Sequence, residues 1–362
     1  MKIKRLLPVF IILCLAVTAG GCSRNRNEKY TAGRISLDTY VSVTLYGCGS
    51  DELVREALDL CDYYAGIFSR TDSTSLLYGL NEKGRMEIAG EKEKILADVI
   101  KQSVETGDAT DGALDIAIEP LTSLWNFKDS DNVPDSEAIS RACEKVDYKR
   151  IKVTDSNIEL NGTRLDLGAV AKGYIADRIC DFLRENGVDS AIVSLGGNVA
   201  CVGRKPDGND FTIGIQKPFG EQSDVAAAIE LNDMSAVTSG VYERYFYADD
   251  RLYHHILDPD TGMPSDNGLL SVTIISADSF LCDSLSTGCF VMGKERAAKL
   301  LDSMDGVYGI FIDEDYNITY TDGAEDFLKN KEEKWTTQSK ARLKSALTQR
   351  TELRPRAYLR TG

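Results

Sequence analysis

The stretch RLDLGAVAKGYIADRI, residues 164–179, carries the most specific pattern in the 362-residue chain. From about residue 169 to 186 apolar side chains recur at helical spacing, and Gly187 follows where such a helix would end. Asp166 precedes the predicted helix start, where unpaired N–H groups and the helix dipole favour an anion, and Lys172 adds a full positive charge. The pattern indicates a phosphate-binding helix start. A capped helix with a surface lysine would account for it equally well.

Predicted helices and strands on both sides of this stretch indicate an α+β body. Before it, we expect a strand at 35–46, a helix at 51–68 capped by Ser50, and a helix at 91–106 stopped by Gly107. After it, β-rich runs separated by Gly, Asp and Asn predict strands, with a hairpin turn at Asp249–Asp250. The remaining predictions are strands within 190–203, 211–216, 234–240, 242–257 and 269–276, a helix at 278–303 and a hairpin around 313–316.

The charge balance argues against a nucleic-acid partner. The chain has 57 acidic and 42 basic residues, a net charge of −15, whereas binding a phosphate backbone needs a basic face. Its 43% hydrophobic and 27% charged content is that of a folded globular protein. Residues 334–362 depart from this average, with eight basic residues against one acid. We therefore expect residues 329–362 to form an exposed basic extension.

The N-terminus has the parts of an export signal. Basic residues precede the apolar run LLPVFIILCLAV, and small residues lead to Cys22. This pattern predicts a lipoprotein signal at 1–21, a lipid on Cys22 that anchors the body at the extracytoplasmic face of the cell membrane, and a tether at 22–32. Simple cleavage or an uncleaved anchor stays open, because Ala19 stands where leucine is more usual. The later cysteines form no close pair, so we expect buried thiols rather than disulfides or a zinc site.

Further segments contain candidate ligand-binding residues. In SADSFLCDSLSTGCFVMG, Asp283 and Thr287 lie four apart on one helical face, which suits Mg²⁺ or a solvent-facing polar stripe. SLGGNVACVG, 194–203, predicts a turn or a close backbone approach to a ligand. Small and apolar residues dominate the segment TDGALDIAIEPLTSLWNF, 110–127. This segment would either line a pocket for an aromatic ligand or belong to the core. The chain's two histidines, His254 and His255, are either incidental or include its proton carrier for neutral pH.

Six motifs, in chain order, resemble those of the ApbE family of FAD:protein FMN transferases. They are GALD, LDLGAVAKGYIAD, SLGGNV, TSGVYERYF, HHILDPDTGMP and DSLSTGCFVMG, and the resemblance extends over residues 33–328. It implies an α+β fold of the ApbE, T-fold-like type, with mixed β-sheets and packed helices in a single catalytic body. The lipoprotein signal suits this family, whose members commonly work outside the cytoplasmic membrane.

The resemblance also assigns roles to the residues at matching motif positions. It implies that Asp283, Thr287 and the backbone oxygen of Ala169 hold Mg²⁺, and that His255 is catalytic. Three positions depart from the family pattern: leucines replace a methionine and a phenylalanine, and a threonine replaces an aromatic residue or asparagine. The residues implied to contact FAD are Leu37, Thr71, Ala113, Leu114, Asp115, Asp166, Lys172, Ile256 and Leu257, of which Leu37, Thr71 and Leu114 are the three departures.

The implied chemistry is Mg²⁺-dependent transfer of FMN from FAD to a threonine or serine, with release of AMP. Attack by a hydroxyl needs a proton acceptor near neutral pH, which His255 would supply with an ordinary pKa of about 6.5, while strand alternation turns His254 to the opposite face. The implied acceptor is an exported flavoprotein of an electron-transfer system with a D-G-x-[ST]-G-A-[ST]-like segment. An FAD pyrophosphatase giving FMN and AMP, and a lipoprotein that binds flavin without turnover, are the alternatives.

Overall fold

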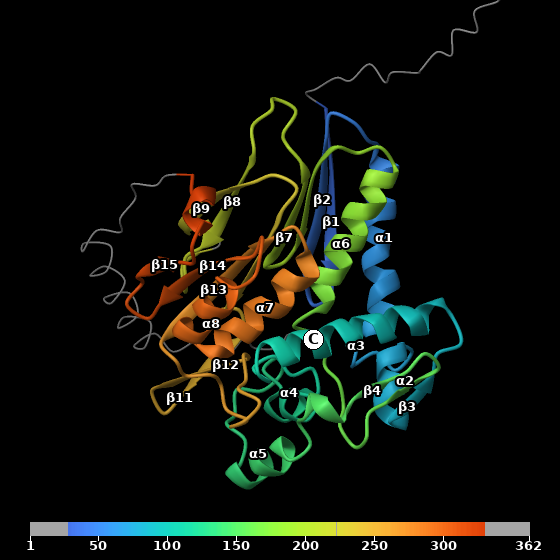
Figure 1. Cartoon of the computed structure of the whole chain (residues 1–362), viewed down its shortest axis with the longest axis vertical. Helices are drawn as coiled ribbons and strands as arrows, with labels where there is room; N and C mark the ends of the chain where they lie inside the picture. The colour runs from blue at the N-terminus through green and yellow to red at the C-terminus, as the bar shows by residue number, and fades with distance from the viewer. Residues whose placement is uncertain (1–27, 222, 330–362) are drawn as a thin grey trace, which may run out of the picture.

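A central eight-stranded antiparallel sheet organises the computed structural model, which describes residues 28–221 and 223–329. The order of strands is β1-β2-β6-β7-β10-β13-β14-β15, so elements from both ends of the chain share one sheet (Figure 1). The predicted α+β class is confirmed. The strands are β1 (Lys29–Ser36), β2 (Thr39–Tyr46), β6 (Ser190–Leu195), β7 (Asn198–Gly203), β10 (Ser235–Gly240), β13 (Leu269–Ser276), β14 (Tyr308–Asp313) and β15 (Ile318–Tyr320).

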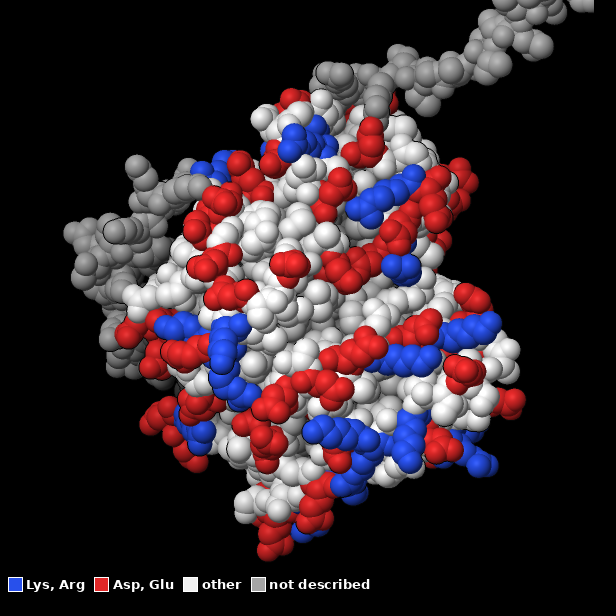
Figure 2. Space-filling model, in the orientation of Figure 1, with Lys and Arg blue, Asp and Glu red and all other residues white. Residues whose placement is uncertain are grey.

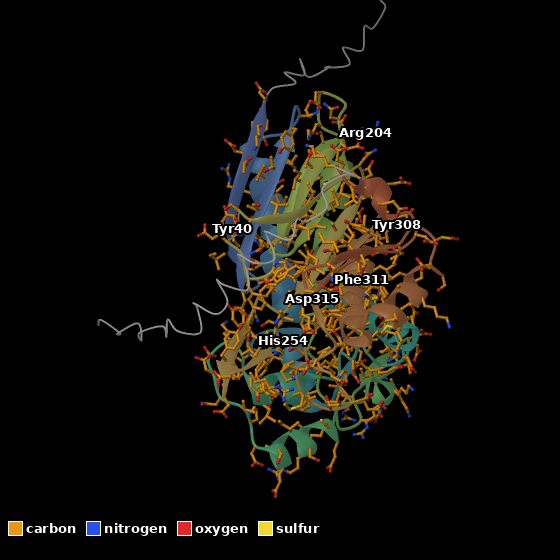
Figure 3. The ribbon with its side chains drawn as sticks, turned by 90° about the vertical axis from the view of Figure 1, so that its left-hand side faces the viewer. Tyr40, Arg204, His254, Tyr308, Phe311 and Asp315 are labelled. Atoms are coloured by element: carbon orange, nitrogen blue, oxygen red, sulfur yellow. The ribbon has the colours of Figure 1, made fainter. Side chains whose placement is uncertain are left out.

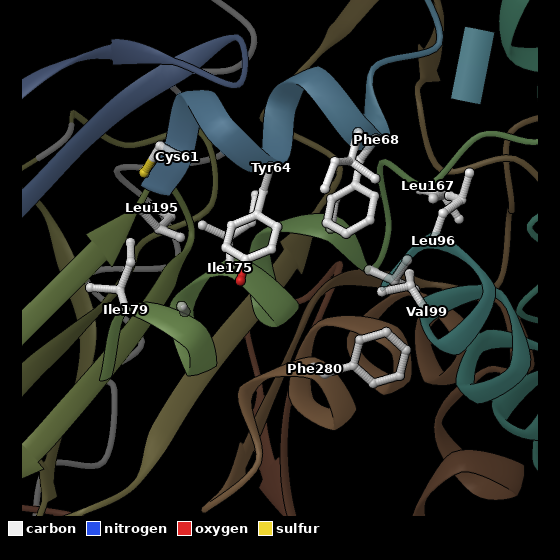
Figure 4. Packing of buried hydrophobic residues seen from close by; sticks show 14 of the residues in the cluster. Cys61, Tyr64, Phe68, Leu96, Val99, Leu167, Ile175, Ile179, Leu195 and Phe280 are labelled. Atoms are coloured by element: carbon white, nitrogen blue, oxygen red, sulfur yellow. The ribbon is translucent and has the colours of Figure 1, made fainter. Parts of the chain in front are cut away.

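Amphipathic helices cover one face of this sheet. α1 (Asp51–Phe68) and α6 (Ala171–Glu185) pack on β1, β2, β6 and β7, while α7 (Ser279–Met292) and α8 (Lys294–Leu301) pack on β10, β13 and β14. Between α1, α6, α7 and α3 (Glu91–Ala109), the side chains of Tyr64, Phe68, Val99, Ile175 and Phe280 meet in one apolar cluster (Figure 4). This cluster fixes the start of α6 against α3 and α7.

Part of the other face is covered by a β-hairpin made of β8 (Phe211–Gln216) and β9 (Val225–Leu231). Its apolar side chains join those of β7, β10, β13 and β14 in a second buried cluster, and the rings of Phe211 and Tyr46 lie 5.5 Å apart. The sheet is therefore an inner layer between helices and a hairpin, seen from the side in Figure 3. On the helical face, acidic and basic side chains are interspersed (Figure 2).

Shorter elements assemble below the central sheet, at the end of the molecule where α2, α4 and α5 lie (Figure 1). The two-stranded ribbon of β11 (Tyr245–Ala248) and β12 (Arg251–His254) packs on α4 through Phe246 and Trp125. The other elements are α2 (Leu76–Lys83), β3 (Arg85–Glu87), α4 (Glu119–Trp125), α5 (Ser136–Cys143), β4 (Lys152–Val153), β5 (Asn157–Glu159) and two 3₁₀ turns, Tyr148–Arg150 and Ala324–Phe327.

Several predicted boundaries are wrong for identifiable reasons. The single strand predicted at 35–46 is a hairpin, because Leu37 and Asp38 both take left-handed backbone angles (φ 53° and 58°) and reverse the chain. Its first strand begins at Lys29, so the predicted tether is too long. α3 continues past Gly107 to Ala109, and this glycine instead leaves room for the ring of Tyr148. Gly293 (φ 79°) breaks the helix predicted at 278–303 into α7 and α8.

Other local predictions are confirmed. The hydroxyl of Ser50 caps α1 by accepting the N–H of Leu53, and Asp249–Asp250 forms the turn between β11 and β12. All seven described cysteines are free thiols, and five are buried. Within residues 28–221 and 223–329, every helix is too short or too polar to cross a membrane. The predicted signal at 1–21, Cys22 and the basic extension after Lys329 lie outside the described residues.

Candidate active site

The predicted helix start and the predicted metal-binding carboxylate meet where α6 touches α7. The Oδ2 atom of Asp283 accepts the backbone N–H of Gly173 at 2.8 Å, and its Oδ1 lies 3.5 Å from Nζ of Lys172. The same ammonium donates to the carbonyl of Gly168 at 3.2 Å. Asp283 is only 3% exposed, so it is not part of a solvent-facing stripe. Burial raises the pKa of this carboxyl, and the charge of Lys172 opposes that rise.

Gly173 allows the two helices to approach this closely. A Cβ at this position would overlap the carbonyl oxygen of Ser279 and would lie 2.7 Å from Cβ of Asp283. Asp177, one turn later on α6, accepts the backbone N–H groups of Ser279 and Phe280 at 2.9 and 2.8 Å. The start of α7 is therefore capped by α6, which places Asp283 beside Lys172.

Gly173→Ala should separate α6 from α7. Because the new methyl group would meet backbone atoms that cannot rotate away, we expect the free energy of unfolding to fall by about 1–3 kcal/mol or more. Gly66→Ala in α1 is the matched control: no atom outside its own helix lies within 4 Å of the added Cβ, so a gain of about 0.5–1 kcal/mol is expected. Denaturant unfolding measures both. A Gly173→Ala variant as stable as the wild type would contradict the required contact.

Hydroxyl groups extend the site along α7. Thr287, one turn beyond Asp283, lies 3.2 Å from the hydroxyl of Ser239 on β10. Among the described residues, no three His, Cys, Asp or Glu side chains gather closely enough to hold a metal ion. A cation at Asp283 would therefore take its remaining ligands from hydroxyls, backbone carbonyls and substrate phosphates, a set of hard oxygens that suits Mg²⁺.

The segment predicted to contact the flavin packs against the same helix. Gly288 of α7 faces Thr110 and Leu114, and a Cβ on it would lie 2.8 Å from the Thr110 methyl group. Leu114 is buried and Ala113 half-buried. The carboxylate of Asp115 points into the protein, where it accepts the N–H groups of Ala117 at 2.6 Å and Tyr148 at 3.0 Å, and burial raises its pKa to about 6.

A second polar cluster surrounds Asp166. Its Oδ2 atom lies 2.8 Å from Nε of Arg70 and accepts the hydroxyl of Thr122 at 2.8 Å, while Oδ1 accepts the N–H of Gly168 at 2.9 Å. Arg70 also donates to Ser123 at 3.1 Å. Asp166 therefore holds the turn that leads into α6. Sequence patterns did not indicate Arg70 or Thr122, because 96 and 44 residues separate them from Asp166.

The turn between β1 and β2 brings further cations toward this cluster. Asp38 accepts a 2.6 Å hydrogen bond from Lys128, and this bond, together with the charges of Lys128, Arg244 and Arg70, lowers the pKa of Asp38. Three cations from three loops thus gather beside the sheet end, in a protein of net charge −15. Sequence reasoning missed Lys128 and Arg244, because their pairing depends on tertiary contacts.

The remaining sequence-predicted residues differ in exposure. Leu37 is half-buried on the hairpin turn, and Thr71 is exposed, with its hydroxyl 3.4 Å from that of Ser69. The side chains of Ile256 and Leu257 are buried in apolar clusters, and the carbonyl oxygen of Ile256 accepts the N–H of Ser265 at 2.9 Å. The Gly196–Gly197 turn closely approaches protein atoms: a Cβ on Gly196 would lie 2.7 Å from Oγ1 of Thr39.

The two histidines occupy different environments. His254, at the end of β12, is buried, with Nε2 3.0 Å from the carbonyl oxygen of Ser265 and its ring edge-on to Phe290. The ring of His255 lies within electrostatic reach of Arg244 and Lys172, and its buried Nδ1 has no hydrogen-bond partner among the described residues. Burial, followed by the positive charges of its neighbours, lowers the pKa of His255 to about 3, so this ring is neutral at neutral pH.

Together these features define a class of site that handles nucleotide phosphates: a lysine at a helix start, a buried carboxylate for a hard cation and a neutral imidazole. Residues 37–311 match the ApbE family model, and the chain belongs to the ApbE family. The predicted family is therefore confirmed.

Named relatives and solved structures agree with this assignment. The FAD:protein FMN transferase of Treponema pallidum is 30% identical over 343 residues, covering 88% of this chain and 94% of that protein. One from Klebsiella pneumoniae is 32% identical over 301 residues, covering 81% and 92%. The crystal structure of the ApbE protein of Thermotoga maritima has a TM-score of 0.76 at 30% identity, covering 84% and 100%. The flavin transferase ApbE of Vibrio cholerae has 0.74 at 25%, covering 83% and 99%.

Proposed function

We propose that this protein transfers FMN from FAD to a threonine or serine hydroxyl of an exported flavoprotein and releases AMP. The observation that carries the proposal is the meeting of Lys172, Asp283 and His255 at one sheet end, in a chain whose relatives are named FAD:protein FMN transferase. The acceptor oxygen attacks the phosphorus of the FMN half, the bond from that phosphorus to the AMP phosphate breaks, and the hydroxyl proton passes to His255. FMN is then held by a phosphoester.

The residues around Asp283 fit a bound Mg²⁺. Asp283, Thr287 and the backbone oxygen of Ala169 would hold it, since the first two present oxygens on one face of α7 and the third precedes α6. A bound Mg²⁺ would neutralise negative charge on the pyrophosphate of FAD. Lys172 adds positive charge on the same side, and the N–H groups at the start of α6 orient the phosphates. These residues position the phosphorus; they do not form covalent bonds with it.

His255 has the protonation state that a general base requires. Its ring is neutral in the free protein, as a proton acceptor must be, although a pKa of about 3 makes it a weaker acceptor than an imidazole of ordinary pKa. The Nδ1 atoms of both histidines lack a hydrogen-bond partner among the described residues, whereas Nε2 of His254 lies 3.0 Å from the carbonyl oxygen of Ser265. The assignment of base to His255 rests on the family motif, and the packing role of His254 rests on its contacts with Ser265 and Phe290.

Hydrolysis of FAD to FMN and AMP is the second candidate activity. It is favoured by one feature, the exposed Thr71, which presents a small hydroxyl instead of the aromatic ring or asparagine of the family pattern. Flavin binding without turnover is disfavoured, since holding a flavin ring requires neither a buried carboxylate at a helix start nor a neutral imidazole.

Incubation with FAD, Mg²⁺ and an acceptor tests the proposal. The acceptor probe is a small carrier protein with an appended DGATGAT segment, and intact-mass analysis follows the reaction. We expect one FMN to be added per acceptor with equimolar AMP, and none when both threonines of the segment are replaced by alanine. Release of FMN and AMP with no labelled acceptor would show that the activity is hydrolysis and not transfer. Unchanged FAD would contradict both activities.

We also propose that a lipid on Cys22 anchors the protein to the outer face of the cell membrane, close to exported acceptors. Cys22→Ala should either release the protein outside the cell or leave an unprocessed precursor, because lipid transfer needs the thiol of this residue. Cell fractionation after labelling with palmitate measures both the lipid and the location of the protein. Cys48→Ala, which removes a half-buried cysteine of the folded body, is the control. A wild-type protein found wholly in the cytoplasm would contradict the proposed location.

A further inference from the structure

Three hydroxyl groups form a chain between β10 and α7, beside Asp283. Oγ of Ser239, a half-buried residue near the end of β10, lies 2.7 Å from Oγ of Ser286 and 3.2 Å from Oγ1 of Thr287. Ser286 is fully buried, and its hydroxyl donates to the backbone carbonyl of Asp283 at 2.9 Å. We call Ser239, Ser286 and Thr287 the hydroxyl chain. It links the strand to two successive residues of the helix.

The hydrogens of the hydroxyl chain have one consistent arrangement, because each hydroxyl carries a single hydrogen. The hydrogen of Ser286 is directed to the carbonyl of Asp283, so Ser239 is the donor in the 2.7 Å contact with Ser286. The hydrogen of Ser239 is then already used, and Thr287 must be the donor in the 3.2 Å contact. Each hydroxyl thus donates to the next along the chain, which ends at the carbonyl oxygen of Asp283.

This arrangement gives the hydroxyl of Thr287 the orientation that a metal ligand needs. A neutral hydroxyl binds a cation through a lone pair on its oxygen, so its hydrogen has to point elsewhere. Because Thr287 directs its hydrogen to Ser239, both lone pairs of its oxygen stay available to other partners. Hydrogen bonds in a chain also polarise one another, which makes the oxygen of the donating Thr287 a better electron-pair donor.

We propose that Ser239 is a positioning residue of the Mg²⁺ site, which holds the hydroxyl of Thr287 with its lone pairs free for the cation. The inference rests on the proposed binding of Mg²⁺ by Asp283 and Thr287. Ser239 acts from β10, a different element from the helix that carries these two residues, so it fixes the hydroxyl from outside α7. Partners that orient metal ligands contribute about 10–100-fold to metal affinity.

Binding of Mn²⁺ to the metal-free protein, measured by electron paramagnetic resonance, tests the proposal with Ser239→Ala. We expect the Kd for Mn²⁺ to rise about 10–100-fold, because the hydroxyl of Thr287 loses the acceptor of its hydrogen. The Mg²⁺ concentration for half-maximal FMN transfer should rise by a similar factor. Ser284→Ala is the matched control: Ser284 is a fully buried serine of α7 whose hydroxyl donates to the carbonyl of Leu281 at 3.1 Å, so the Kd should equal that of the wild type.

Thr287→Val separates orientation of the hydroxyl from packing. Valine has nearly the shape of threonine but no hydroxyl, so adding Ser239→Ala to Thr287→Val should raise the Kd for Mn²⁺ by less than about twofold more. A larger further rise, an unchanged Kd in Ser239→Ala, or an equal rise in Ser284→Ala would each overturn the proposal.

Failure of the sites on which the inference rests would be recognised separately. Wild-type protein that binds no Mn²⁺ would contradict the metal site and the positioning role of Ser239 with it. Wild-type protein that binds Mn²⁺ with the expected effect of Ser239→Ala, but labels no acceptor, would contradict the proposed function and leave the role of Ser239 intact.

Discussion

Asp283→Asn is expected to lower kcat for FMN transfer by at least about a thousandfold while the protein stays folded. The substitution removes the charge beside Lys172 but leaves an amide oxygen that can accept the N–H of Gly173, so the α6–α7 contact survives. Asp283→Ala should be equally inactive but less stable, because the buried N–H of Gly173 would lose its acceptor at a cost of about 1–3 kcal/mol. Transfer rates at increasing Mg²⁺ and thermal unfolding separate the two effects.

Asp278→Asn is the matched control for this carboxylate. Asp278, five residues before Asp283, is the exposed N-cap residue of α7, and its side chain accepts the N–H of Leu281 at 2.8 Å. Asparagine caps a helix as well as aspartate does, so activity and stability should both remain close to those of the wild type. Full FAD turnover in EDTA, or by Asp283→Asn, would contradict the assignment of a metal to this site.

The local features of the site could be predicted from the sequence because they depend on neighbours a few residues apart. The helical spacing of Asp283 and Thr287, the helix after Ala169 and the turn at Asp249–Asp250 each follow from periodicity or turn chemistry. The resemblance to the family motifs indicated, in addition, which of these segments should lie close together. In the structure, two of these segments meet where the N–H of Gly173 on α6 donates to the carboxylate of Asp283 on α7.

The electrostatic partners could not be predicted, because they depend on residues distant in sequence. No local pattern indicates that Arg70 would pair with Asp166, or that the carboxylate of Asp115 would accept the backbone N–H groups of Ala117 and Tyr148. The left-handed turn at Leu37 was missed for a different reason. Turns of this kind favour Gly or Asn, and a leucine at the first turn position gives no such signal.

His254 and His255 should separate in function although they are adjacent. His255→Gly should retain FAD binding but lower the rate of FMN transfer by at least about a hundredfold, the lower range for loss of a general base. His254→Gly should act through stability, lowering the free energy of unfolding by more than about 1 kcal/mol, because it removes the contacts with Ser265 and Phe290. The measurements are the Kd for FAD, the transfer rate with one acceptor and denaturant unfolding for both variants.

The acid side of the pH profile provides an independent test of the same assignment. Burial lowers the pKa of His255 to about 3 and that of His254 to about 4, so both rings stay neutral in the folded protein well below the ordinary value of about 6.5. Unfolding would let both rings bind protons, and stability should therefore fall as the pH drops below about 6.5. The transfer rate of the folded enzyme should show no loss with a midpoint near 6.5. Such a midpoint would contradict the lowered pKa of His255, whereas equal losses of transfer in the two variants, or near-normal transfer by His255→Gly, would mean that another group or water takes the proton.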